Sequence, residues 1–402
     1  MAIDLFSADP TVSFVELDDD TARQFNQAAD QYYHRFANVD YESNKPFANY
    51  REAAMISFQI GLLLAGAKIG RAQQILEFGA GAGWLASLVH RLGNELTLLE
   101  VSPKALEMAQ ETFRRDTRNG VHAVGPHFDL YDGFRFPYGD ECFDRILCFD
   151  ALHHVPNPAR ILGEMQRVLR PGGVAGFVES GRRHAELPAI IDCVSRTGIL
   201  ERNTRLDEIH ALAQAAGFTG LTIKAFPTQD AWEVDYETYQ RRGLDAIDTA
   251  EIASGFDAGN QSVFMLHKGP FAFDGTYPSR PAVRIEPDTA RVAARAGERF
   301  SLGLRLTNTG RTRLNATSHP LGGYAALGAH LFAGGEVVNF DLVHHPLPGD
   351  LELAASCRLS VELTAPAMPG RYELEWDVVI EGVQWLAQVG SPTARVALEV
   401  AP

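Results

Sequence analysis

Three glycines alternate with alanines at residues 79–83, directly after an apolar stretch at residues 75–78. Glycine allows a ligand to approach the backbone closely and allows the chain to turn sharply. The residues that follow favour a helix, whose first N–H groups would be free to bind a ligand. An acid, Glu77, lies two positions before the first glycine. The segment therefore predicts a ligand-binding turn between a buried strand and a helix.

A second acid, Glu100, ends the next apolar stretch along the chain. A carboxylate at this place can accept hydrogen bonds from both hydroxyls of a ribose. The glycines at residues 79–83 and the acid Glu100 together predict a binding site for a nucleotide-type ligand. Two alternatives remain open: a tight turn without a ligand, and a dinucleotide-binding fold, since residues 81–86 also fit GxGxxA. Against the dinucleotide fold, an acid ends the first strand and helices precede that strand.

The elements that would position these residues alternate between strand and helix. Apolar stretches predict strands at residues 74–78, 95–100, 145–150, 173–179, 221–225 and 262–267. Helical patterns occur at residues 19–36, 50–65, 103–115, 159–169 and 206–216. Such alternation is typical of an α/β domain with a mostly parallel sheet. Ligands bind at the carboxyl ends of the strands in open sheets of this kind.

The last third of the chain has a different period. Apolar residues alternate with polar or small ones at residues 300–306, 357–363 and 372–380, which predicts antiparallel strands in a β-sandwich. Residues 269–281 are rich in glycine, proline and aromatic residues, as a connector would be. We place the boundary near residue 275 and expect two domains, at residues 1–275 and 276–402.

The motifs of the first domain, in their order, resemble those of class I S-adenosylmethionine-dependent methyltransferases. Residues 77–83 (EFGAGAG) resemble the first motif of that family, and Glu100 its ribose-binding acid. Residues 136–144, 149–155 and 169–173 resemble its later motifs. The resemblance covers about residues 50–268. It implies a Rossmann-like, seven-stranded, mostly parallel sheet with S-adenosylmethionine as cofactor, and residues 31–36 suggest an N-terminal helical lid over it.

The resemblance also implies which residues hold the cofactor. The glycines would let the backbone pass close to its methionine part, and Asp132 would contact the adenine amino group. Asp150 would line the cleft at the end of the fourth strand. The implied cofactor-binding residues are Glu77, Gly79, Ala80, Gly81, Gly83, Trp84, Glu100, Val101, Ser102, Asp132, Gly133, Asp150 and Ala151.

Methylation of a hydroxyl requires a general base. His153 and His154 follow the fourth strand, while Glu179 and His184 lie at and after the end of the fifth. Imidazole titrates near neutral pH and suits this task. The candidate catalytic residues are therefore Glu179, His184 and His154, although each has an alternative structural role. We expect no metal site.

Two features of the sequence indicate the class of acceptor: the absence of one motif from the first domain and the character of the second domain. The first domain lacks the Asn/Asp-Pro-Pro-aromatic motif of amino-group methyltransferases, which favours oxygen methylation. The second domain resembles immunoglobulin-like accessory sandwiches that bind polysaccharide, so a glycan or glycoconjugate is the leading acceptor. The alternatives are O- or C-methylation of a small-molecule natural product, a non-catalytic glycan-binding protein, and a nicotinamide-dependent oxidoreductase.

Composition limits the other partners. The formal net charge is −15, from 36 basic and 51 acidic residues, and the first 275 residues carry −13 of it. An acidic protein repels phosphate backbones, so we expect no nucleic acid. No apolar stretch reaches about 18 residues, and the first ten residues do not resemble a secretory signal. These features predict a cytoplasmic protein without a membrane span, of undetermined oligomeric state.

Overall fold

A computed structural model describes residues 14–70, 73–118, 125–224, 236–242, 261–269, 273–274, 281–310, 312–317 and 322–402. The described residues form two compact units, one within residues 1–270 and one mainly within residues 271–402. The exact boundary expected near residue 275 lies outside the described residues.

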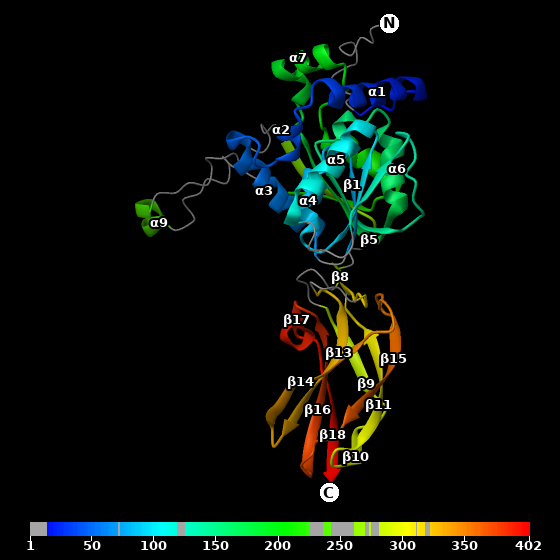
Figure 1. Ribbon diagram of the computed structural model, residues 1–402, viewed down its shortest axis with the longest axis vertical. Coiled ribbons are helices and arrows are strands. Elements are labelled where there is room, and N and C mark those ends of the chain that lie inside the picture. The colour runs from blue at the N-terminus through cyan, green and yellow to red at the C-terminus, as the bar shows by residue number, and fades with distance from the viewer. Residues whose placement is uncertain are drawn as a thin grey trace. The chain divides into compact units, whose positions relative to one another are not determined.

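The first unit is built on a seven-stranded sheet with the strand order β3-β2-β1-β4-β5-β7-β6 (Figure 1). Strands β1 to β5 pair in parallel, whereas β7 runs antiparallel to both β5 and β6. The strands are β1 (Gln74–Phe78), β2 (Glu95–Glu100), β3 (His127–Leu130), β4 (Phe143–Phe149), β5 (Leu169–Ser180), β6 (Gly220–Ile223) and β7 (Gln261–His267). The prediction of a mostly parallel sheet is confirmed.

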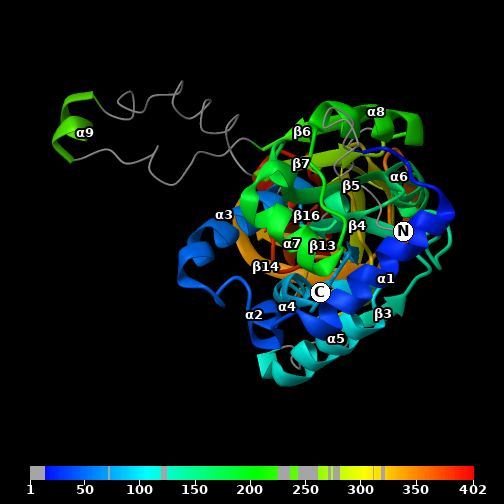
Figure 2. The ribbon, with the colours of Figure 1, turned by 90° about the horizontal axis from the view of Figure 1, so that it is seen from above.

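Helices cover both faces of this sheet, with α3, α4 and α5 on one side and α6 and α8 on the other (Figure 2). Coverage of both faces explains why β4 and β5 are apolar and buried along most of their length. The helices are α1 (Asp19–Arg35), α2 (Val39–Ser43), α3 (Tyr50–Ala67), α4 (Trp84–His90), α5 (Pro103–Arg115), α6 (Pro158–Val168), α7 (Pro188–Thr197), α8 (Leu206–Ala216) and α9 (Tyr236–Arg242). Two short 3₁₀ turns are η2 (Leu152–His154) and η3 (His184–Glu186).

Local sequence sets the ends of these helices. Helix α5 begins where the Ser102 hydroxyl accepts the backbone N–H of Ala105 at 3.0 Å, with Pro103 in the first turn. Its buried residues recur at helical spacing and face the sheet. They are Ala105, Leu106, Met108, Ala109 and Thr112. The helix therefore fixes the segment that follows Glu100.

The expected elements of the first unit all have counterparts, with some shifted ends. Strand β5 begins at Leu169 rather than at residue 173, and helix α3 continues to Ala67 rather than residue 65. Residue 225, at the end of the sixth expected strand, lies outside the described residues. The sequence analysis missed β3, an edge strand with half-exposed or exposed residues and no clear apolar run.

The second unit is all β, as predicted. One sheet has the order β10-β18-β16-β13-β14 with β17 beside β16, and a second has the order β15-β11-β9. Most pairs are antiparallel, while β10 and β18 are parallel. These strands are β9 (Val283–Pro287), β10 (Arg291–Arg295), β11 (Arg299–Asn308), β13 (Ala325–Ala333), β14 (Glu336–Pro346), β15 (Ser356–Thr364), β16 (Gly370–Ile380), β17 (Gln384–Trp385) and β18 (Ala394–Ala401). The short strands β8 (Phe273–Asp274) and β12 (Thr312–Arg313) form a separate pair.

Both main sheets of this unit contribute to one hydrophobic core. Leu304 and Leu306 of β11 and Val361 of β15 are buried together with Trp376 and Val378 of β16. The alternation read from the sequence therefore places apolar side chains between the sheets. Among the helices in the described parts of the chain, none is long and apolar enough to cross a bilayer.

Candidate active site

The glycine loop connects β1 to α4 in a conformation that requires glycine. Gly79, Gly81 and Gly83 have φ angles of 65°, 52° and 72°. A Cβ atom on Gly79 would lie 2.4 Å from the Cβ of Ala151, and one on Gly81 would lie 2.8 Å from the Tyr33 hydroxyl. Neighbouring segments therefore approach the loop so closely that side chains are excluded.

Glu100 holds this loop against the end of β2. Its buried carboxylate accepts hydrogen bonds from the backbone N–H groups of Gly81 at 2.9 Å, Val101 at 2.8 Å and Ser102 at 3.1 Å. Burial raises the pKa of Glu100, and these backbone donors counteract that effect. The second acid of the sequence pattern thus orders the first motif while it also lines a cavity.

Glu77 is buried beneath the same loop. Its Oε2 atom has no hydrogen-bond partner among the described residues. Burial raises the pKa of Glu77 to about 8. A buried carboxylate with an unpartnered oxygen is suited to a positively charged ligand group.

A cavity of about 280 Å³ lies beside the glycine loop. Helix α1 contributes Tyr32 and Tyr33 to its wall, which is the position expected for an N-terminal lid. Gly79, Glu100, Val101, Asp150 and Ala151 also line it. The cavity therefore brings together residues from the ends of β1, β2 and β4, as the sequence predicts for a parallel sheet.

Asp132 belongs to a neighbouring hollow rather than to this cavity, and Gly133 is among the lining residues of neither. Asp132 lines that hollow, and its Oδ1 accepts the backbone N–H groups of Phe134 at 2.8 Å and Arg135 at 2.9 Å. Asn26 of α1 lines both spaces, and its buried Nδ2 has no partner among the described residues. The sequence analysis missed Asn26, because nothing in a helical pattern marks it.

Asp150 follows β4 with a φ of 50°, in the left-handed region. Its side chain remains accessible from the cavity. The surrounding protein nevertheless raises the pKa of Asp150 to about 6, because desolvation outweighs the attraction of His153.

Of the remaining expected cofactor residues, Ala80 and Trp84 are buried, and Ser102 caps α5. None of these three is among the residues that line the cavity in the described part of the chain. Their side chains therefore belong to the support of the loop.

Glu179 ends β5 as a fully buried carboxylate. It accepts the backbone N–H of Leu152 at 2.9 Å and lies 2.6 Å from His153 Nδ1. It also accepts the backbone N–H of Ala151 at 3.2 Å and the thiol of Cys148 at 3.2 Å. Burial alone would raise its pKa, but the contact with His153 and these donors lower it. Glu179 therefore fixes the η2 turn and lies behind the cavity wall.

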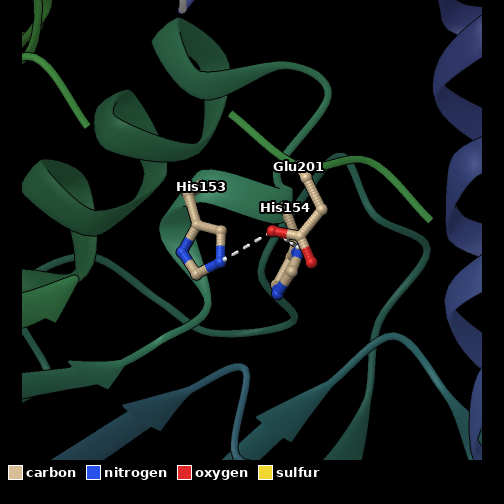
Figure 3. A group of neighbouring side chains, drawn as sticks. All are labelled: His153, His154 and Glu201. Atoms are coloured by element: carbon tan, nitrogen blue, oxygen red, sulfur yellow. Dashed lines mark ion pairs between the residues drawn. The ribbon is translucent and has the colours of Figure 1, made fainter. Parts of the chain in front are cut away.

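Three histidines converge on one carboxylate, Glu201, which lies between α7 and α8. Figure 3 shows two of them, His153 and His154, beside this carboxylate. Its Oε2 is 3.0 Å from His184 Nε2, 3.4 Å from His153 Nε2 and 3.8 Å from His154 Nδ1. Burial opposes charge on His153, but Glu179 and Glu201 outweigh it and raise its pKa to about 10. The same histidines hold the pKa of Glu201 well below its usual range against the effect of burial.

His154 and Glu201 line the cavity, whereas Glu179 and His184 do not. The Nδ1 of His154 lies 2.6 Å from the Leu200 carbonyl oxygen. Burial, followed by the charge on His153, lowers the pKa of His154. The structure thus brings all three candidate catalytic residues into one cluster and places His154 at its accessible side. The sequence analysis missed Glu201, which lies in a connecting segment without a motif.

Comparison with known proteins agrees with this architecture. Residues 76–177 match the family model described as "Methyltransferase domain". The chain is 29% identical over 159 residues to methyltransferase GfsG of Streptomyces halstedii, which covers 39% of this chain and 56% of the relative. It is 29% identical over 136 residues to a ubiquinone biosynthesis O-methyltransferase of Paracidovorax citrulli, covering 33% and 54%. The chain thus spans about half the length of these relatives.

A solved S-adenosylmethionine-dependent methyltransferase of Mesorhizobium loti superposes with a TM-score of 0.39 at 17% identity, over 52% of this chain and 96% of that one. The first unit therefore contains a class I S-adenosylmethionine-dependent methyltransferase domain, on the strength of the family model and the relatives. S-adenosylmethionine is the cofactor expected for this domain.

Proposed function

We propose that this chain transfers the methyl group of S-adenosylmethionine to a hydroxyl oxygen of a small-molecule acceptor. One observation carries the proposal: a single cavity is lined by Gly79 of the glycine loop and by Glu100, and also by Asp150, His154 and Glu201. The relatives named as ubiquinone biosynthesis O-methyltransferases support oxygen as the methylated atom.

The residues beside the glycine loop fit the cofactor. Glu100 would accept hydrogen bonds from its ribose hydroxyls, and Asp132 would face its adenine. Glu77 and Asn26 each offer a buried polar atom without a partner among the described residues, as a ligand with an ammonium and several polar groups requires. When bound, S-adenosylmethionine supplies a reactive methyl group on its sulfonium sulfur.

The cluster on the other side of the cavity would act on the acceptor. The Leu200 carbonyl oxygen accepts a hydrogen bond from the Nδ1–H of His154, so Nε2 keeps a lone pair. An acceptor hydroxyl bound at Nε2 would give its proton to His154 while its oxygen forms the new bond to the methyl carbon. Alignment of the two groups in the cavity would supply much of the remaining rate increase.

The proposal is tested first by calorimetry with S-adenosylhomocysteine and with NAD. We expect binding of S-adenosylhomocysteine alone; binding of NAD without S-adenosylhomocysteine would overturn the proposal in favour of an oxidoreductase. Methyl transfer from labelled cofactor is then measured with phenols, sugar nucleotides and lipid-linked oligosaccharides. Mass spectrometry of the labelled product then identifies the methylated atom, because it distinguishes an ether, a methyl ester and a C-methyl product.

A glycan acceptor is the second candidate, and an aromatic cluster of the second unit favours it. Trp385 lies 4.4 Å from the His330 ring and 5.5 Å from the Phe340 ring, measured between centroids. Phe340 is exposed, and aromatic faces suit stacking on sugars. Trp376 of β16 is fully buried and therefore takes no part. Quenching of tryptophan fluorescence by oligosaccharides tests this role, and Phe340→Ala should abolish the change.

A further inference from the structure

The histidine cluster has more potential ligand atoms than removal of one proton requires. His153, His154 and Glu201 each offer one ligand atom, and these three atoms lie within 4.8 Å of one another. In Figure 3 the imidazole rings of His153 and His154 lie beside the carboxylate of Glu201. Nitrogen and carboxylate ligands in this number are typical of sites for transition-metal ions.

The separation of the ligand atoms fits one small ion. Two ligands on a tetrahedral zinc ion with bonds of about 2.0–2.1 Å lie about 3.3–3.4 Å apart. His153 Nε2 and Glu201 Oε2 are separated by 3.4 Å, and one ligand atom from each of the three residues lies within 4.8 Å of the other two. The separation of 3.4 Å exceeds the 2.7–2.9 Å or so of a charge-assisted hydrogen bond. Small rotations of the side chains would therefore admit an ion between them.

Each of these three residues also contacts a second group that orients it, as metal ligands usually do. Glu179 lies 2.6 Å from the other ring nitrogen of His153, which is the carboxylate–histidine pairing found behind many metal ions. The Leu200 carbonyl lies 2.6 Å from His154 Nδ1, so that Nε2 is the nitrogen left for an ion. His184 lies 3.0 Å from the Glu201 carboxylate. The site is thus oriented without an ion.

Charge balance also favours a cation. The side chains of Glu179 and Glu201 are 0% and 7% exposed, and their ion pairs among the described residues involve histidines alone. Buried charges in proteins are paired or bind metals. One dication would balance both carboxylates and leave the imidazoles uncharged.

We propose that His153, His154 and Glu201 bind one divalent transition-metal ion of the zinc type, with an open coordination position toward the cavity. His154 and Glu201 line that cavity, so the ion would be within reach of an acceptor oxygen. This role in acceptor binding rests on the proposed function, whereas metal binding itself does not. With the ion bound, the metal would polarise the acceptor hydroxyl so that its proton passes to solvent water as the oxygen–methyl bond forms, and His154 would serve as a ligand instead of as the base.

The test uses the full chain with any affinity tag removed, after dialysis against a chelator. Zinc chloride is titrated by calorimetry and cobalt chloride by visible absorption, with magnesium chloride as a hard-cation comparison. We expect one zinc ion per chain with a dissociation constant below about 1 µM, visible cobalt bands, and no comparable binding of magnesium. Failure of the wild-type chain to bind zinc or cobalt overturns the proposal.

Two variants locate the ion, and a third controls for adventitious binding. Glu201→Gln and His154→Ala should each weaken zinc binding at least about tenfold. His344→Ala should leave it unchanged, although His344 also lies near two carboxylates, at 2.6 Å from Glu381 and 3.4 Å from Asp341. Unchanged affinity in both site variants, or a loss in His344→Ala, overturns the assignment. If circular dichroism shows that the Glu201→Gln variant is unfolded, the His154→Ala variant tests the proposal alone, because His154 is partly exposed.

The same samples separate this proposal from the proposed function. Binding of S-adenosylhomocysteine and methyl transfer are measured on the chelated chain before zinc is added. Methyl transfer without any zinc binding refutes the metal site and leaves the methyltransferase intact. Zinc binding without binding of S-adenosylhomocysteine refutes the methyltransferase and leaves the metal site intact.

Discussion

The Nδ1 atom of His154 lies 2.6 Å from the carbonyl oxygen of Leu200, and this contact selects the ring nitrogen that can act on a substrate. A carbonyl oxygen only accepts hydrogen bonds, so Nδ1 must donate and Nε2 carries the lone pair. The neighbouring His153 ring, 3.9 Å away between centroids, is held by two carboxylates and carries the charge. The pair thus combines one charged and one neutral imidazole.

Replacement of His154 by alanine should therefore affect turnover rather than cofactor binding. We expect kcat to fall by about 10²–10⁴, the usual contribution of a general base, while the Kd for S-adenosylhomocysteine stays unchanged. His210→Ala, at an exposed position of α8, is the matched control and should behave as wild type. Steady-state kinetics and calorimetry on both variants check this, and equal turnover in the two would contradict the role of His154.

Glu179→Gln should reduce stability, because the carboxylate accepts several donors in the core. An amide would place N–H groups opposite some of these donors, and it would remove one of the two carboxylates beside His153. We expect a loss of about 3 kcal/mol or more in the free energy of unfolding, measured in urea. Glu186→Gln is the control, since Glu186 pairs with Arg183 at the surface and should cost less than about 1 kcal/mol. Equal losses of stability in both variants would contradict a stabilising role for the buried hydrogen bonds of Glu179.

Much of the first unit was predictable because its determinants are local in the sequence. The apolar runs of β1 and β2, the glycine loop and Glu100 form a continuous pattern over residues 74–102. The parallel sheet then fixes which strand ends meet. The edge strand β3 lacked such a pattern, because its residues are only partly buried.

The acceptor side was less predictable, because it depends on contacts between distant segments. His153 and Glu201 are 48 positions apart, yet Glu201 joins all three histidines. Asn26 reaches the two hollows only because α1 lies across the strand ends. Glu179 and His184 were placed near the right strand ends by sequence, but neither of them lines the cavity, which the sequence does not reveal.

Gly79→Ala should impair cofactor binding more than stability. The new Cβ would lie 2.4 Å from that of Ala151, in a residue with a φ of 65°, and the loop would have to move. Gly198→Ala is the matched control, because its φ of 72° gives similar strain of about 1–2 kcal/mol while nothing lies within 4 Å of the new Cβ. We expect at least about a tenfold rise in the Kd for S-adenosylhomocysteine in Gly79→Ala alone. Calorimetry on the two folded variants measures this difference. Equal affinities for S-adenosylhomocysteine would show that the loop is not the binding site.

Glu77 should make the ligand-free protein less stable as the pH rises. Its pKa is about 8 in the folded chain against an ordinary value of 4.5, so between these values the folded state retains a proton that the unfolded chain has lost. Stability therefore falls as the pH rises through this window, and the penalty is complete above pH 8. Glu77→Gln removes the titration, so its stability relative to wild type should increase from pH 5 to pH 9.

Thermal unfolding across that pH range measures this difference, with Glu352→Gln as the control at an exposed position. The control corrects for the charge change and should give a difference from wild type that varies little with pH. A Glu77→Gln curve that runs parallel to wild type would mean that Glu77 titrates alike in both states. In that case the carboxylate has a partner in the folded chain, and the unpartnered Oε2 atom would no longer support an ammonium site at this position.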